Sequence, residues 1–136
     1  MVDQAEEIRR WETCQELYEA ADAALRQQRY RTSAGLAYYA CFQAMWLALR
    51  DPPLGEWRHL GITRRFCHGR WADPPLVPTS LATLYKRLLA LYELRLDAHY
   101  RAQPIPAEQS QQGLDTATEV IRLIEQHRRE SPQEQA

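Results

Sequence analysis

The sequence lacks a long hydrophobic run and has few cysteines. No stretch of about 18 consecutive apolar residues occurs, and the first residues, MVDQAEEIRRWE, are acidic where a signal peptide would be basic and then apolar. We therefore expect neither a membrane span nor export. The three cysteines form no CxxC pair, so neither a disulfide framework nor a zinc ribbon fits, and a reducing cytoplasm is the expected location.

The chain also lacks an excess of charge of either sign. Its formal net charge is −1, so it has no overall positive field of the kind that DNA-binding domains use. The charges are nevertheless segregated, since residues 1–25 hold seven acids against two arginines, whereas residues 57–72 hold four arginines and no acid. Lys86 is the only lysine; the preference for arginine suits planar phosphate contacts, although codon bias is the simpler explanation.

Alternating strand patterns are absent, and the 136 residues have the composition of one soluble domain. Between proline-rich breaks, apolar residues recur every three or four positions, which is typical of amphipathic helices. This predicts an all-α fold, a four- to five-helix up-and-down bundle with a long excursion between the second and third long helices. The expected long helices are residues 4–28, 32–50, 78–100 and 107–128, with a short helix at 62–68 in the connection 51–77. The domain is expected to span 1–130, followed by a polar tail, 131–136.

The second expected helix, residues 32–50, is apolar on nearly its whole circumference. A bundle of this size hides only part of such a surface, so a partner chain is the expected cover. The sequence therefore predicts a homodimer.

The most informative stretch is residues 91–100. The apolar stripe of the third long helix continues to Arg95 and His99, which replace the expected leucines on one helical face. A cation facing the core needs either an acid from another helix or a bound anion. We predict that Arg95 and His99 are the catalytic pair, with Asp97 and Tyr100 orienting the histidine. The structural alternative is an ion pair between Arg95 and an acid of the first helix, with His99 in solvent.

The connection is the second candidate site. Its aromatic residues, Trp57, Phe66 and Trp71, interleave with cations, a mixture that binders of single-stranded nucleic acid use. Four of its residues are candidate nucleic-acid or nucleotide contacts: Arg58, His59, Arg64 and Arg65. A loop that packs onto the bundle through its tryptophans, with its arginines in solvent, explains the same residues.

Metal and cofactor motifs give weaker signals. The ExxH pattern from Glu56 to His59 has no second copy, as a di-iron bundle would need, and neither GxGxxG nor GxxxxGK[ST] is present. Cys41 lies on the apolar face of its helix and is expected in the core. We expect no metal and no cofactor.

Three segments together resemble HEPN-domain proteins, small helical proteins often encoded beside minimal nucleotidyltransferases. They are residues 29–44, then His59-Leu60-Gly61 followed by Phe66, and then residues 91–100. The resemblance covers about residues 10–128. It implies a four- or five-helix bundle that forms a two-fold dimer and, in many members, metal-independent RNA cleavage by an Arg-x(4–6)-His motif.

By position, that motif's arginine corresponds to Arg95 and its histidine to His99, although three residues separate them here. Arg122 and His127 satisfy the spacing but lie outside the motif's position, so we treat them as a chance match. Many family members with an aspartate before the tyrosine do not cleave RNA, and His99-Tyr100 stands in that place. The alternative is therefore a non-catalytic module that binds a nucleotide or a nucleotidyltransferase partner.

Overall fold

The part of the chain that the structure describes folds into five α-helices and one 3₁₀ turn. The computed structural model describes residues 3–50, 52 and 55–128. The elements are α1 (Gln4–Arg26), α2 (Tyr30–Leu49), α3 (His59–Phe66), the 3₁₀ turn η1 (Pro78–Leu81), α4 (Ala82–His99) and α5 (Ala107–His127). No strand forms within the described residues, where Ala72 and Arg128 make one isolated bridge. The all-α prediction is confirmed.

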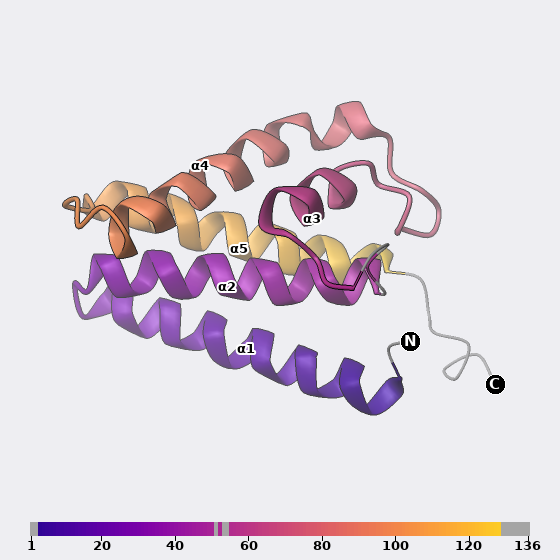
Figure 1. The fold of residues 1–136 in the computed structure, drawn as a ribbon, viewed down its shortest axis with the longest axis horizontal. Coiled ribbons are helices and arrows are strands. Elements are labelled where there is room, and N and C mark those ends of the chain that lie inside the picture. Colours follow the sequence, from indigo (N-terminus) through magenta and orange to yellow (C-terminus); the bar gives the residue numbers. More distant parts are fainter. Residues whose placement is uncertain (1–2, 51, 53–54, 129–136) are drawn as a thin grey trace.

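The four long helices run up and down along one direction (Figure 1). Helices α1 and α2 lie side by side and antiparallel, while α4 runs back across the bundle and α5 returns, so that the start of α1 and the end of α5 lie at the same end. The predicted excursion is present: α3 packs on α2 and α4 beside the long connection. None of the described helices has the length and apolar character to cross a membrane.

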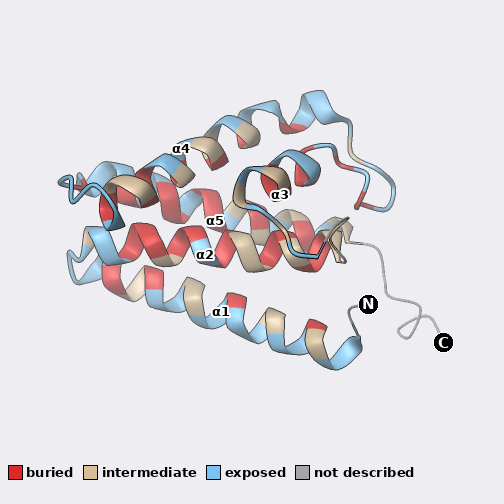
Figure 2. Ribbon diagram, in the orientation of Figure 1, coloured by how far each residue is buried: buried red, intermediate tan, exposed pale blue. Residues whose placement is uncertain are grey.

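Helix α2 is the centre of the bundle, because α1, α3, α4 and α5 all contact it. Figure 2 shows its turns largely in the colour of buried residues, and its small side chains let the other helices come close. A partner chain was the expected cover of this helix, whereas other helices of the same chain cover most of it. Burial of α2 therefore does not by itself require a second copy.

Three helix starts differ from the sequence expectation. Helix α2 begins at Tyr30, two residues before the expected start at residue 32. Helix α3 begins at His59, three residues before the expected Ile62. The expected helix from Pro78 begins as the turn η1, in which the Ser80 hydroxyl bonds the Val77 carbonyl instead of capping a helix. Proline fixes a backbone angle suited to such a first turn, and the α-helical hydrogen-bond pattern begins only at Ala82.

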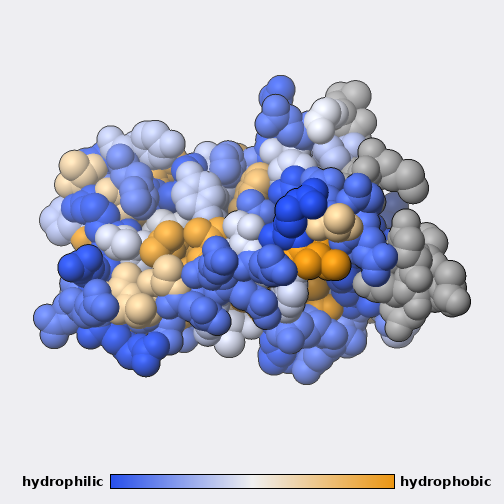
Figure 3. All heavy atoms as spheres, turned by 90° about the horizontal axis from the view of Figure 1, so that it is seen from below, coloured by the Kyte–Doolittle hydropathy of each residue, from blue (hydrophilic) through white to orange (hydrophobic). Residues whose placement is uncertain are grey.

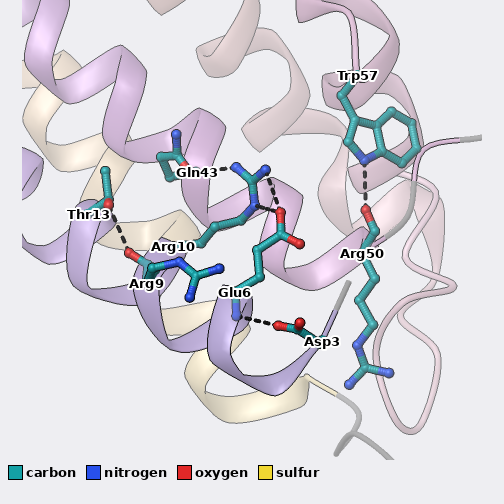
Figure 4. A network of polar contacts seen from close by, with 8 residues as sticks. All are labelled: Asp3, Glu6, Arg9, Arg10, Thr13, Gln43, Arg50 and Trp57. Carbon is teal, nitrogen blue, oxygen red and sulfur yellow. Dashed lines mark hydrogen bonds and ion pairs between the residues drawn. The ribbon is translucent and has the colours of Figure 1, made fainter. Parts of the chain in front are cut away.

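The beginning of α1 is fixed by a polar network (Figure 4). Asp3 caps the helix by accepting the backbone N–H of Glu6 at 2.7 Å. Arg10 bonds Glu6 and reaches across to Gln43 of α2, and its guanidinium stacks 3.7 Å from the ring centre of Trp46. The acidic face of α1 itself remains outside, and the view from below shows apolar residues only as separate patches among hydrophilic ones (Figure 3).

Candidate functional site

Arg95 of α4 lies against α2 and is only 4% exposed. Four tyrosine rings surround its guanidinium, and we call them the tyrosine cage: Tyr38, Tyr39, Tyr92 and Tyr100, with ring centres 4.8, 5.6, 5.3 and 5.4 Å from Cζ. Its Nη1 donates a hydrogen bond to the Tyr39 hydroxyl at 3.1 Å. The cage thus holds a buried cation by cation–π contacts and one neutral acceptor.

No carboxylate of the described residues forms an ion pair with Arg95. The expected alternative, an ion pair with an acid of the first helix, is therefore not what the structure contains. The Nε atom is buried and has no hydrogen-bond partner. A buried arginine with unused donors and no counter-charge has a strong preference for an anion.

Arg95 is charged despite its burial. Burial lowers the pKa of the guanidinium, but the hydroxyls of Tyr39 and Tyr100 outweigh that effect, and the net pKa is raised. Tyr39 and Tyr100 are the exposed members of the cage, at 39% and 70%, whereas Tyr38 is fully buried. Tyr39 and Tyr100 therefore form the solvent-facing side of the cage, and Arg95 lies beneath them.

His99 follows Arg95 by one helical turn and lies against Gly35 of α2. A Cβ atom added at Gly35 would stand 2.0 Å from Nε2 of His99, so the imidazole occupies the space that the missing side chain leaves. The residue is otherwise exposed. The structure thus places Arg95 and His99 on one face of α4, both toward α2, as the helical spacing predicts.

His59 enters the same region from the start of α3. Its Nδ1 lies 2.5 Å from the Tyr38 hydroxyl, and its ring centre is 5.0 Å from Phe42 and 6.0 Å from Tyr92. Burial and then the positive charge of Arg95 lower the pKa of His59. The imidazole is therefore neutral at neutral pH. His59 was predicted as part of the connection, whereas in the structure it contacts Tyr38 and Tyr92 of the tyrosine cage.

The two predicted supporting residues, Asp97 and Tyr100, lie in different parts of the structure. Tyr100 is part of the cage, but Asp97 is ion-paired with Arg101 at 2.9 Å and lies in a groove between α4 and α5. Position 97 is on the opposite side of the helix from position 95. The expectation that Asp97 orients His99 has no contact to support it.

Two of the three aromatic residues of the connection are buried, and the third, Trp57, is half-buried. Phe66 and Trp71 are buried and stacked on each other with ring centres 4.8 Å apart, and the Trp57 indole donates to the Arg50 carbonyl (Figure 4). The four arginines of this segment are exposed: Arg58, Arg64, Arg65 and Arg70. This arrangement matches the packed-loop alternative, in which tryptophans anchor the segment and arginines face solvent.

Sequence reasoning missed three members of the cage. Tyr38, Tyr39 and Tyr92 were not among the predicted site residues, yet their rings surround Arg95. A signal was present in α4, since Tyr92 precedes Arg95 by three residues and so shares its face. Nothing local indicated that Tyr38 and Tyr39 of α2 would meet it.

The cysteines and the described acids offer no further chemistry. Burial raises the pKa of the Cys14 and Cys67 thiols to about 12, and it raises that of Cys41 as well. All three are therefore protonated, buried side chains, as expected for Cys41. Within the described part of the chain, no group of three His, Cys, Asp or Glu side chains is placed to hold a metal ion.

Comparison with known proteins adds no family to this description. No protein-family model matches the sequence, and a search of curated proteins finds no match to it.

Proposed function

We propose that this chain is a HEPN-like RNA-binding domain in which Arg95 receives a phosphate group and His99 makes the domain a metal-independent endoribonuclease. The observation that carries the proposal is the buried Arg95 without a carboxylate partner, in a cage whose members Tyr39 and Tyr100 face solvent. A phosphate supplies the missing negative charge and accepts the free guanidinium donors. Exposed tyrosine rings beside it offer faces for unpaired bases.

The same geometry supports a cleavage role for His99. An imidazole one helical turn from Arg95 is suited to remove the proton of a ribose 2′-hydroxyl, while the guanidinium stabilises the charge that develops on the attacked phosphate. The space at Gly35 sets the position of the His99 ring, and the ring is otherwise exposed to substrate. Both roles need only side chains of this chain.

Binding tests the phosphate contact directly. We expect Arg95→Met to weaken binding of a labelled single-stranded RNA by about 10- to 100-fold, the usual cost of losing hydrogen bonds to a charged group. Methionine fills the cage without charge, so the bundle remains folded. Fluorescence anisotropy over a salt series measures the affinity, and circular dichroism checks the fold.

Two matched variants locate the binding surface. Arg122→Met removes an exposed arginine of α5 and should leave the affinity unchanged. The double variant Arg64→Glu/Arg65→Glu reverses the charge on α3. If RNA affinity falls in this variant but not in Arg95→Met, the RNA binds at the connection and not at Arg95. Unchanged affinity in Arg95→Met contradicts the phosphate contact at Arg95.

We also propose that the domain acts as a homodimer, and that a minimal nucleotidyltransferase is its partner protein. Three large apolar side chains are exposed on the helices that form the Arg95 site or directly after them: Tyr39 of α2, Leu60 of α3 and Tyr100 after α4. A two-fold axis on this side would bring two copies of Arg95 and His99 into one cleft. Light scattering at micromolar concentration should give twice the chain mass of 15.9 kDa. A mass near 15.9 kDa contradicts the homodimer.

A further inference from the structure

One ring nitrogen of His59 is hydrogen-bonded within the chain, and the other has no such partner among the described residues. Nδ1 lies 2.5 Å from the Tyr38 hydroxyl. Nε2 has no hydrogen-bond partner among the described residues. It is also not sealed from solvent. The ring is half-buried between α2 and α4. Nε2 is therefore the atom that His59 presents to a ligand.

The partner atom decides which nitrogen of His59 carries the proton. The Tyr38 side chain is 1% exposed, its hydroxyl has no other hydrogen-bond partner in the described chain, and burial raises its pKa, so it keeps its proton. A buried hydroxyl donates where an acceptor is available, because an unused donor is costly. Tyr38 therefore donates to Nδ1, which leaves the proton of a neutral imidazole on Nε2.

The surroundings favour the neutral ring from every side. The titratable and charged groups that face His59 are Tyr38 of α2 and Tyr92 and Arg95 of α4, and no described carboxylate pairs with it. The cation disfavours a second positive charge beside it. A neutral imidazole that donates from Nε2 is suited to an anionic oxygen, whereas it has no lone pair on that atom to act as a base.

We infer that His59 is a second ligand-binding residue of the Arg95 site, a neutral donor whose Nε2–H bonds a phosphate oxygen of single-stranded RNA and whose tautomer is set by Tyr38. This inference rests on the proposed function and deepens it. It divides the two histidines by role, since His59 donates a hydrogen bond to the phosphate while His99 removes the proton. Arg95 and His59 then contact one phosphate from α4 and α3.

The tautomer is measured in the free protein by ¹⁵N NMR of the imidazole. We expect the Nε2–H form of His59 at pH 7, and a changed Nε2–H resonance when single-stranded RNA is added. Tyr38→Phe removes the donor to Nδ1, so the single tautomer should be lost. Tyr18→Phe is the matched control, because its hydroxyl bonds Thr118 at 2.6 Å between α1 and α5. It should leave His59 unchanged.

Affinity for the same RNA separates this inference from the proposed function. We expect His59→Ala to weaken binding about tenfold and His59→Gln, a permanently neutral donor, to recover most of the loss. A dominant Nδ1–H tautomer contradicts the role of His59 and leaves the Arg95 contact in place. So does full RNA affinity in His59→Ala when Arg95→Met has lost affinity. Lost affinity in His59→Ala with full affinity in Arg95→Met rejects the Arg95 contact and keeps His59. Full affinity in both variants rejects both.

Discussion

RNA incubated with the wild-type protein in EDTA is expected to be cut to products ending in a 2′,3′-cyclic phosphate, and Arg95→Met and His99→Ala are each expected to lower the rate by about 10²-fold or more. The cyclic end is the product of attack by the ribose 2′-hydroxyl on the adjacent phosphate. EDTA removes divalent metal, so activity in its presence separates this mechanism from metal-assisted hydrolysis.

Gly35→Ala gives a sharper test, because it moves His99 without removing it. The added methyl group would stand 2.0 Å from Nε2, so the exposed ring must leave its place. Alanine is better than glycine in a helix by about 1 kcal/mol, which offsets the cost of that displacement. We therefore expect a folded protein with the activity of His99→Ala.

The controls use the chance motif of α5. Arg122→Met and His127→Ala remove the pair with the literal family spacing, and both should cleave like the wild type. Cleavage that needs metal, or that survives loss of both Arg95 and His99, contradicts the mechanism. No cleavage by the wild type, together with tight binding to a nucleotidyltransferase, assigns the domain to the non-catalytic alternative.

Glu7→Ala is expected to reduce the free energy of unfolding by about 3 kcal/mol, near the lower end of the cost of breaking a buried ion pair. The Glu7 side chain is 8% exposed and pairs with Arg50, directly after α2, at 3.2 Å and with Arg128, directly after α5, at 2.8 Å. Its loss leaves two partly buried arginines facing each other. Both arginines reach solvent to some extent, which limits the cost.

Urea unfolding measures this effect as a lower midpoint with an unchanged slope. Glu16→Ala, which removes an exposed acid from the same helix, is the matched control and should stay within about 0.5 kcal/mol of the wild type. Equal midpoints for Glu7→Ala and the wild type would show that the three-residue cluster adds nothing to stability.

The sequence predicted the helices because proline-rich breaks separate segments with clear helical periodicity. The same periodicity placed Arg95 and His99 on one face of α4, since that inference needs only the geometry of a single helix. It also places position 97 across the helix from position 95, where the structure pairs Asp97 with Arg101.

The rest of the site depends on contacts between helices. Tyr38 and Tyr39 reach Arg95 only because α2 and α4 pack together, and His59 reaches Tyr38 only because α3 folds back onto them. The position of α3 depends in turn on buried connection residues such as Phe66 and Trp71. Single-sequence patterns describe the faces of helices but not which faces meet.

The Glu7 cluster also bears on the order of folding. Its members come from the beginning of the chain, the end of α2 and the end of α5, so the cluster closes one of the longest loops that this chain can form. Closing a long loop costs entropy before the contact stabilises anything. The hairpins of adjacent helices need far shorter loops, so they can assemble first, and the cluster then locks an almost complete bundle. The cluster is therefore expected to lower the unfolding rate and to have little effect on the folding rate.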